Sequence, residues 1–488
     1  MGASAGLVSG AAWPENRGAI IRAASHRSSG KNLNVAPAGA QPRIVSRSEH
    51  PISRNAISAN ALRVLYRLKE AGYQAFLVGG SVRDLLLGLQ PKDFDIATNA
   101  LPEEVKALFR NCRLIGRRFR LAHVFYGSEI VEVATFRAAH EWQPEERDED
   151  EWRAAGENSE RLLDARGRIL RDNVYGTIEE DVWRRDFTAN ALYYNIEDFS
   201  VWDFVGGVED VGARRLRLIG DPVTRYHEDP VRMLRAARFA AKLGFTLDAA
   251  TEKPVRELAY LLTHVPPARL FDEMLKLFLS GFGAPALRLL RNYGLLAPLY
   301  RPTAELLERD PQGPAARLLQ SGLEGTDARV AADKPVTPTF LFAILLYGPI
   351  MDRAARLQAN GQPESHALFN ACEETVREQQ SRVSIPRRFT LPMREMFVLQ
   401  PRFRRREGKK ALALLNHPRF RAAYGLLLLR VQAGAEDPEL AQWWTQVQVA
   451  PAQEHESMVK QAEPAADGAR ARRPRRRRRG RRRSAPPA

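Results

Sequence analysis

The chain has 488 residues, a hydrophobic content of 44% and a formal net charge of +16. This length exceeds what one hydrophobic core supports, so we expect about two to four domains. The two cysteines, Cys112 and Cys372, lie far apart, which argues against a disulfide framework or a zinc site and predicts a reducing, cytoplasmic location. No apolar stretch is long enough to span a bilayer, and we expect no secretory signal and no membrane contact.

The positive charge is concentrated near the C-terminus. Eleven arginines lie between Arg470 and Arg483, and this segment contains no acidic residue. Without them the net charge would be about +5 (16 − 11). A tail of this kind either keeps a protein soluble or contacts a polyanion, and we expect contact with nucleic acid.

The N-terminal part of the chain predicts disorder followed by the start of a folded domain. Residues 1–47 are rich in Gly, Ala, Ser and Arg and show no lasting periodicity; an organellar transit peptide is the alternative. Apolar spacing of three and four predicts a helix over 61–70. Residues 75–78 predict a buried strand that ends at two glycines, and 82–87 a short helix that Gly88 can terminate.

The next segments predict two more strands and then a mostly helical chain. Strands are expected over 93–97 and 129–136. The highly charged stretch from 138 to about 172 predicts a surface loop. From about 230 onward the periodicity is mostly helical, and disorder is expected again after about 451.

Two aspartates one residue apart are the strongest chemical signal in the chain. Asp93 and Asp95 would point to the same side of a strand, where two carboxylates repel each other unless a cation lies between them. Mg²⁺ is usually held by one or two carboxylates together with substrate phosphates. The preceding Gly79, Gly80 and Ser81 form a turn whose backbone N–H groups can bind a phosphate. The combination predicts metal-assisted nucleotidyl transfer.

Other charged residues are candidates for the same site. Glu132, in the strand over 129–136, is a candidate third carboxylate. Arg83 either reaches a triphosphate or pairs with a local acid, and the same alternatives apply to Arg184 and Arg185. The structural alternative for Asp186 is a favourable position near a helix start. His123 stands without a second histidine nearby, so we expect a packed or hydrogen-bonded side chain.

Asp229 and Arg232 could recognise a base. An Asp acceptor and an Arg donor on one helical turn match the amino group and a ring nitrogen of adenine. The structural alternative is complete in itself, with Asp229 as N-cap and Pro230 at the first helical position. Arg232, Arg235 and Arg238 recur every three residues and form a basic stripe.

Cations alternate with aromatic residues farther along the chain. Arg387, Arg388 and Phe389 form one such group, and 402–406 with Lys409 and Lys410 form another. The pattern predicts a path for single-stranded RNA with phosphate contacts and base stacking. The alternative is a solvated helix face whose arginine stems cover apolar surface.

Taken together, these motifs resemble the class II nucleotidyltransferases of the polymerase-β superfamily, which comprise bacterial poly(A) polymerases and CCA-adding enzymes. The resemblance covers roughly residues 50–430. It rests on LVGGSVRD at 77–84, DFD at 93–95, RRDFT at 184–188 and EDPVR at 228–232. The stretches PKDFDIAT, FRNCRLIGRRFRLAHV and EDPVRMLRAARFAAKL and the arginine-rich C-terminus resemble the poly(A) polymerase branch.

The resemblance implies an α+β fold in which a small mixed-sheet nucleotidyltransferase head carries the metals and an all-helical neck and body follow. The expected divisions are a disordered extension (1–47), the head (48–205), the neck for nucleotide and RNA recognition (206–280), the RNA-binding body (281–450) and a disordered arginine-rich tail (451–488).

The implied activity is template-independent addition of AMP from ATP to single-stranded RNA 3′ ends with Mg²⁺, which marks RNA for decay. Asp93 and Asp95 would be metal ligands, and either Glu132 or Asp186 the third functional carboxylate. The residues expected at the nucleotide are Gly79, Gly80, Ser81, Arg83, Arg184, Arg185, Asp229, Arg232 and Arg235. RNA-decay proteins are partners by analogy. The alternatives are a CCA-adding enzyme and a catalytically inactive RNA-binding protein on the same scaffold.

Overall fold

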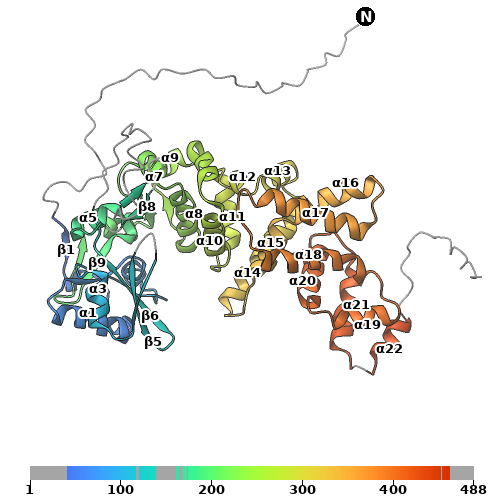
Figure 1. Ribbon diagram of the computed structural model, residues 1–488, viewed down its shortest axis with the longest axis horizontal. Coiled ribbons are helices and arrows are strands. Elements are labelled where there is room, and N and C mark those ends of the chain that lie inside the picture. The colour runs from blue at the N-terminus through green and yellow to red at the C-terminus, as the bar shows by residue number, and fades with distance from the viewer. Residues whose placement is uncertain are drawn as a thin grey trace, which may run out of the picture.

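The computed structural model shows an elongated molecule with a mixed α/β unit at one end, from which a succession of helices extends (Figure 1). It describes residues 41–116, 120–138, 161–163, 169–172, 174–451 and 453–461. Most of the predicted N-terminal extension, the acidic stretch near 140–160 and the arginine-rich segment of the tail lie outside the described residues.

The head is built on an eight-stranded sheet in the order β1-β10-β9-β2-β3-β6-β5-β4. Only β3 and β6 pair in parallel; the other neighbours are antiparallel. The strands are β1 (Arg43–Val45), β2 (Ala75–Val78), β3 (Asp95–Thr98), β4 (Cys112–Ile115), β5 (Leu121–Tyr126), β6 (Glu129–Thr135), β9 (Leu192–Asn195) and β10 (Val201–Asp203).

The two faces of this sheet are packed differently. One face contributes Leu77, Ile96 and Val133 to the main core, where α1 (Ala59–Glu70) and α3 (Pro102–Leu108) contact it. On the other face, β2 and β9 pack under α5 (Ile178–Arg184) in a second, smaller cluster that includes Val78, Tyr193 and Val182. Because side chains alternate along a strand, the second face of the sheet is the one that carries Asp95.

After the head the described chain is almost entirely helical. A short parallel pair, β11 (Arg215–Leu216) and β12 (Thr246–Leu247), is the exception. The helices are α6 (Gly207–Gly212), α7 (Pro222–Glu228), α8 (Val231–Leu243), α9 (Ala249–Leu258), α10 (Pro267–Phe278), α11 (Gly283–Asn292), α12 (Leu296–Leu299), α13 (Arg301–Arg309), α14 (Pro314–Ala331), α15 (Pro338–Leu345), α16 (Tyr347–Ala359), α17 (Glu364–Gln379), α18 (Arg387–Phe403), α19 (Gly408–Leu415), α20 (Phe420–Gln432), α21 (Pro438–Val449) and α22 (His455–Gln461). In the described ranges, no helix is both long and apolar enough to cross a membrane.

The predicted fold class is confirmed, as are the elements around the glycine turn. β2 has the predicted bounds, and α1 begins two residues before the predicted helix. The helix after the glycines, α2 (Gly80–Leu86), starts at the second glycine. β3 begins at Asp95 rather than Asp93, so Asp93 lies in the segment just before the strand.

Four short elements contradict predictions of irregular structure. β1 lies within the range predicted to be disordered and pairs with β10 at the sheet edge. β7 (Arg161–Leu163) and β8 (Ile169–Asp172) form a two-stranded sheet within the predicted loop. α22 lies within the predicted disordered tail. Segments of three to seven residues are too short to show a hydrophobic period, so tertiary pairing decides their structure.

The predicted RNA path along α18 is also wrong in one respect. Phe403 is fully buried and packs against Phe420 and Trp444. Phe389 is stacked on Phe271 at a centroid distance of 6.0 Å. The Phe403 ring is therefore not available to stack on a base, whereas the Phe389 ring is partly exposed and Arg387, Arg388, Arg402 and Arg405 are exposed.

Candidate active site

The glycine turn after β2 brings two arginines together. Gly79 has φ +76°, a conformation that favours glycine. A Cβ on Gly79 would lie 3.7 Å from Nη1 of Arg185, and a Cβ on Gly80 would lie 3.3 Å from Nη2 of Arg83. The absence of side chains at both positions leaves room in the turn beside two guanidinium groups, of which Arg83 is buried against Asp84 and Asn190 and Arg185 suits a polyphosphate.

A row of acidic residues begins on the strand next to this turn. Asp95 at the start of β3 is paired with Val78, the last residue of β2, and on its other side with Glu132 of β6. Asp93 lies two residues before Asp95. We call Asp93, Asp95 and Glu132 the acidic row.

The electrostatics of the acidic row indicate a site that is short of positive charge. Asp95 is exposed to solvent on one side, but the surrounding protein removes part of its hydration. This desolvation, with the nearby Glu132 and Asp93 carboxylates, raises the pKa of Asp95 to about 6, although Arg185 and His123 act in the opposite direction. A carboxylate whose pKa is raised by neighbouring carboxylates lies in a suitable environment for a cation.

The acidic row fits Mg²⁺ by its donor chemistry. Among the described residues, no group of three or more His, Cys, Asp or Glu side chains is arranged to hold an ion unaided. Mg²⁺ does not require such a cage, because it is usually bound through one or two carboxylates, water and substrate phosphates. The two aspartates beside an open, arginine-lined turn offer that kind of partial site.

His123 extends the row to the next strand. It is the cross-strand partner of Glu132 on β5, and its Nε2 lies 3.2 Å from Glu132 Oε2. The His123 side chain is only 20% exposed. This contact restricts the rotamers of Glu132, and it agrees with the prediction of a hydrogen-bonded histidine.

The buried residues near the glycine turn hold it in shape. Arg83 is 2% exposed and donates from Nε and Nη2 to Asp84 at 2.9 and 2.6 Å, and from Nη1 to Asn190. The hydroxyl of Ser81 is buried and donates to the carbonyl of Val78 at 3.0 Å. Ser81 therefore stabilises the turn through its side chain.

Two side chains, Tyr193 and Asp181, fix the orientation of the Arg185 guanidinium. Its Nε donates to the Tyr193 hydroxyl at 2.7 Å, and its Nη2 donates to Asp181 at 2.9 Å. Burial lowers the pKa of Arg185, but Tyr193 and Asp181 outweigh it and raise the pKa above its ordinary value. The guanidinium stays charged and keeps Nη1 directed toward Gly79. Arg184, the last residue of α5, lies beside it in the chain.

Asp186 is engaged in a different direction from the acidic row. Its Oδ2 accepts from Nε and Nη2 of Arg235 on α8, at 2.8 and 2.5 Å. Its Oδ1 accepts from the backbone N–H of Phe187 and the amide of Asn190. Burial raises the pKa of Asp186, but Arg235 outweighs it and holds the pKa at about 2. Asp186 thus joins the head to α8.

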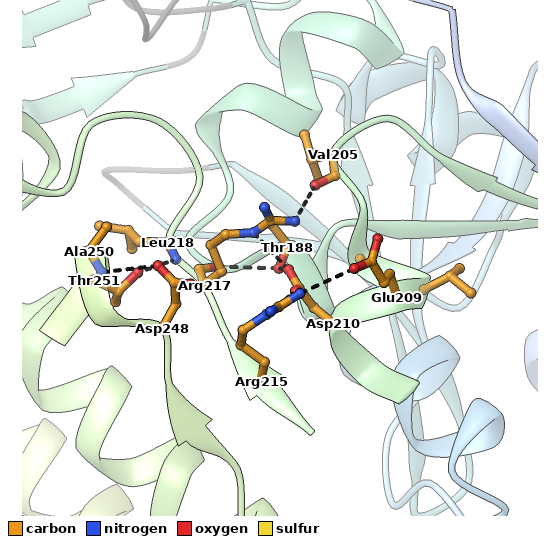
Figure 2. Close-up of polar contacts among 12 residues, drawn as sticks. Thr188, Val205, Glu209, Asp210, Arg215, Arg217, Leu218, Asp248, Ala250 and Thr251 are labelled. Atoms are coloured by element: carbon orange, nitrogen blue, oxygen red, sulfur yellow. Dashed lines mark hydrogen bonds and ion pairs between the residues drawn. The ribbon is translucent and has the colours of Figure 1, made fainter. Parts of the chain in front are cut away.

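A second buried carboxylate, Asp210, strengthens the same junction (Figure 2). Its side chain is fully buried and accepts from Nε of Arg215 at 2.7 Å, Nε of Arg217 at 2.8 Å and the Thr188 hydroxyl at 2.7 Å. The backbone N–H of Thr188 donates to the carbonyl of Arg217 at 2.9 Å. The RRDFT segment is therefore fixed to the first residues of the neck.

The predicted base-recognition residues lie at the junction of α7 and α8. Asp229 follows α7, and its Oδ1 accepts from the backbone N–H of Val231, as the capping alternative requires. Its Oδ2 accepts from Arg269 of α10 at 2.7 Å. Asp229 therefore caps the start of α8 and also contacts a charged side chain.

Arg232 belongs to a buried arginine–glutamate network. Glu228 accepts from Arg232 and from Arg225, each at 2.8 Å. Nη2 of Arg225 also donates to the carbonyl oxygens of Arg184 and Arg185, at 3.0 and 2.6 Å. Burial, with the neighbouring Arg232 charge, lowers the pKa of Arg225 to about 10. The network links Arg232 to the backbone of Arg184 and Arg185.

The basic stripe on α8 is divided among different partners. Arg232 pairs with Glu228, and Arg235 with Asp186. Arg238 lies with its guanidinium carbon 4.7 Å from the centroid of the Phe239 ring. The three side chains therefore do not act as one continuous surface for a ligand.

Sequence reasoning found most of the charged residues here but missed others. His123 was not assigned to the site, and Arg225 and Arg269 were not considered. The i, i+3, i+7 spacing of Arg225, Glu228 and Arg232 was a signal for the network. The contact of Arg269 with Asp229 gave no local signal, because it joins residues 40 positions apart.

Three protein-family models match parts of the chain. Residues 75–217 match the family described as "Poly A polymerase head domain". Residues 244–307 match "Probable RNA and SrmB- binding site of polymerase A", and residues 360–483 match "Polymerase A arginine-rich C-terminus".

Curated relatives give the same assignment over nearly the whole chain. Poly(A) polymerase I of Escherichia coli O6:H1 is 47% identical over 439 residues, covering 89% of this chain and 92% of that protein. Poly(A) polymerase I of Haemophilus influenzae is 44% identical, covering 86% and 90%. The CCA-adding enzyme of Geobacillus thermodenitrificans is 37% identical over 235 residues, 48% of this chain and 53% of that protein.

Solved structures share the architecture. The Bacillus stearothermophilus CCA-adding enzyme in complex with CTP has a TM-score of 0.51 at 26% identity and covers 79% of this chain and 80% of its own. The Thermotoga maritima CCA-adding enzyme complexed with tRNA has a TM-score of 0.53 at 17% identity, covers 87% and 91%, and supports the fold alone. The extent and identity of the matches show that the chain belongs to the poly(A) polymerase family of nucleotidyltransferases.

Proposed function

We propose that the acidic row is the catalytic centre at which this poly(A) polymerase adds AMP from ATP to the 3′ ends of single-stranded RNA, which marks the RNA for decay. The observation that carries the proposal is the alignment of Asp95 and Glu132 on adjacent strands, directly beside the open glycine turn and Arg185. Carboxylates and a phosphate-binding turn are the two components that phosphoryl transfer requires, since it depends mainly on positioning and charge neutralisation.

Asp93 and Asp95 would hold Mg²⁺ together with the triphosphate. When bound, Mg²⁺ would lower the pKa of the attacking hydroxyl and offset negative charge on the leaving group. The raised pKa of Asp95 supports this role, because the two neighbouring carboxylates leave the site in need of positive charge.

The triphosphate would lie in the glycine turn. Arg185 and Arg83 flank Gly79 and Gly80. Ser81 and Arg184 were predicted to lie at the nucleotide; in this proposal Ser81 instead maintains the turn through its hydrogen bond to Val78, and Arg184 ends the neighbouring helix α5. The charged Arg185 guanidinium suits the β- and γ-phosphates, which leave as pyrophosphate.

The adenine base would be recognised at Asp229 and Arg232, as predicted from their donor and acceptor pattern. The predicted contact of Arg235 with the nucleotide is replaced in this proposal by its pairing with Asp186. Arg225 supports both ends of the nucleotide site, because it contacts Glu228 and the carbonyls of Arg184 and Arg185.

The reaction forms one bond and breaks one bond at the α-phosphorus of ATP. The RNA 3′-oxygen attacks the α-phosphorus, and the bond from that phosphorus to the β-phosphate oxygen breaks, releasing pyrophosphate. Glu132, whose carboxylate is 40% exposed beside Asp95, would accept a hydrogen bond from the attacking 3′-hydroxyl and take up its proton as the bond from oxygen to phosphorus forms.

Glu132 is therefore our choice for the third functional carboxylate. Both oxygens of Asp186 already accept hydrogen bonds, and Arg235 compensates its charge. Asp186 is better suited to fixing the RRDFT segment against α8.

RNA and ATP are the expected partners, and the relatives' "Probable RNA and SrmB- binding site" corresponds to residues 244–307 of this chain. We also propose that the chain contacts RNA-decay proteins. The division into head, neck and body with the boundaries given above, and a cytoplasmic location, form part of the same proposal.

Primer extension tests the activity. Purified protein is incubated with a short single-stranded RNA, Mg²⁺ and each nucleoside triphosphate alone. We expect a long ladder with ATP only, and loss of at least about a hundredfold in rate in Asp95→Asn. Addition that stops after two or three residues and requires CTP would indicate a CCA-adding enzyme. Unchanged addition by Asp95→Asn would overturn the catalytic assignment, and the absence of any product would indicate an RNA-binding protein.

A further inference from the structure

The acidic row continues onto a part of the sheet that the proposed chemistry does not use. Strand register places Glu132, His123 and Arg113 side by side on β6, β5 and β4, on one face of the sheet. The same register pairs Phe125 with Ile130, and Ile115 with Leu121. All of these side chains point to the face that carries Asp95.

This face differs from the two packed parts of the sheet. Ala122, Val124 and Cys112, on the opposite face of the same strands, belong to the main core. By contrast, Phe125, Ile115 and Ile130 belong to neither hydrophobic cluster of the described residues. We call Arg113, Ile115, Phe125 and Ile130 the open sheet face.

The open sheet face exposes apolar and aromatic groups beside a cation. Ile115 and Ile130 are 43% and 45% exposed. Phe125 is partly exposed, the guanidinium carbon of Arg113 lies 5.6 Å from its ring centroid, and its centroid lies 6.3 Å from that of the His123 ring. An aromatic ring with a stacked guanidinium is an arrangement on which unpaired nucleic-acid bases stack.

The in-line geometry of phosphoryl transfer places the RNA on the side of Asp95 that carries the open sheet face. The proposed triphosphate site lies at β2, on one side of Asp95, and the open sheet face lies beyond Glu132 on the other. In phosphoryl transfer the attacking and leaving oxygens are roughly in line. Because pyrophosphate leaves toward β2, the RNA 3′-hydroxyl approaches from the β6 and β5 side.

The distances suit the last nucleotides of an RNA strand. Neighbouring strands lie about 4.8 Å apart, so β5 and β4 are about 10 and 14 Å from Asp95. Stacked nucleotides advance about 3.4 Å each, which brings the third or fourth nucleotide from the 3′ end over these strands. Figure 1 shows β5 and β6 on the side of the head nearer to the helical part of the molecule.

We propose that the open sheet face binds the 3′-terminal nucleotides of the RNA, with Phe125 and Arg113 stacking on the base of the third or fourth nucleotide from the end. This inference rests on the proposed function, because it takes the acidic row as the site of AMP transfer. The stacking contacts do not read base edges, so the face accepts any RNA sequence.

The test compares the Michaelis constant for RNA in variants from the two edges of the sheet. Phe125→Ala and Arg113→Ala remove the stacking groups, whereas Ile44→Ala and Arg43→Ala change exposed residues of β1 at the opposite edge. We expect KM for a short single-stranded RNA to rise about tenfold in each of the first two variants. In the same two variants, KM for ATP should stay within twofold of its value in the unmodified protein. The two β1 variants should match the unmodified protein in KM for both substrates.

A conservative variant and a cross-link separate stacking from folding. Phe125→Tyr keeps the ring and is expected to retain the original KM for RNA. An RNA with a photoreactive base at its third position from the 3′ end should cross-link to the peptide that contains Phe125. An unchanged KM for RNA in Phe125→Ala and Arg113→Ala, or cross-linking only to the body, would overturn the inference. If the unmodified protein adds no AMP, the proposed function itself fails instead.

Discussion

Asp186 and Arg235 form a two-point ion pair that joins the RRDFT segment of the head to helix α8 of the neck. Two nitrogens of the Arg235 guanidinium donate to the same carboxylate oxygen, at 2.8 and 2.5 Å. The Asp186 side chain is only 11% exposed. The pair therefore contributes to the placement of the RRDFT segment relative to α8 as well as to stability.

The ion pair predicts a defined pH dependence. The pKa of Asp186 falls from 3.8 to about 2 on folding, so its contribution is complete above about pH 4 and is lost as the pH falls toward 2. Asp186→Asn should lower the free energy of unfolding by about 2 kcal/mol at pH 7. Urea titrations of both proteins at pH 7 and pH 3 measure this difference, which should be smaller at pH 3.

The control for Asp186→Asn is a substitution in a solvent-exposed ion pair of the protein. Glu305→Gln removes the partner of Arg301, and both side chains are largely exposed. Its effect should stay below about 0.5 kcal/mol. An equal loss of stability in the two variants would contradict a special role for the Asp186–Arg235 pair.

Replacing Asp95 should raise the stability of the protein, whereas replacing Asp186 should lower it. Its pKa is raised from 3.8 to about 6, so its ionised form costs stability above pH 6, and the cost disappears below about pH 4. Asp95→Asn should therefore unfold at a higher temperature than the unmodified protein in EDTA at pH 7.5. The gain in the free energy of unfolding should stay below about 1 kcal/mol, because solvent screens the exposed side of Asp95.

The thermal comparison also needs a matched acid. Glu103→Gln changes a carboxylate that is 56% exposed and distant from the row in the fold. It should leave the unfolding temperature in EDTA nearly unchanged at both pH 7.5 and pH 4. A lower unfolding temperature for Asp95→Asn at pH 7.5 would show that the carboxylates of the row do not repel one another.

His123 is a positioning residue for Glu132. Removing its Nε2, which lies 3.2 Å from Glu132 Oε2, frees the carboxylate to adopt other rotamers. His123→Ala should lower kcat about tenfold with little change in KM for ATP or RNA. Steady-state kinetics with each substrate varied in turn measure kcat and the two KM values separately. His366→Ala, an exposed histidine on α17, is the control, and a loss confined to KM would refute the positioning role.

Asp210 predicts the strongest structural effect at the junction of head and neck. Asp210→Asn leaves Arg215 and Arg217 without their shared carboxylate and should cost about 2 kcal/mol or more of unfolding free energy. Glu209→Gln is the matched control, because Glu209 is 72% exposed and contacts Arg215 only at 3.4 Å. Similar urea midpoints for the two variants would contradict the importance of the network in Figure 2.

The local chemistry of the head could be predicted from sequence, because short-range signals determine it. The strand at 75–78 and the glycine turn follow from residues within about ten positions of one another. The predicted strand position of Asp93 is wrong, because β3 begins at Asp95. The pairing of Asp95 with Glu132 could only be suspected, since it depends on strand register across 37 positions. Asp186 illustrates the limit: its partner Arg235 lies 49 positions away.

Aromatic residues in a helical region were harder to interpret. Phe389 and Phe403 lie among arginines, a pattern equally compatible with RNA stacking and with a helix that buries one side and exposes the other. The structure assigns Phe403 to the core. Phe125, by contrast, alternates with core residues on β5 and is left partly exposed, which no local pattern distinguished from ordinary packing.

We propose that the acidic row, with Glu132 as its third member, carries out AMP transfer. The decisive measurement is single-turnover incorporation of AMP by Glu132→Gln at saturating ATP and RNA, with the folded state verified by its unfolding temperature. We expect a rate lower by about a hundredfold or more, and a smaller loss in Asp186→Asn. Wild-type rates in Glu132→Gln together with an inactive, folded Asp186→Asn would contradict it.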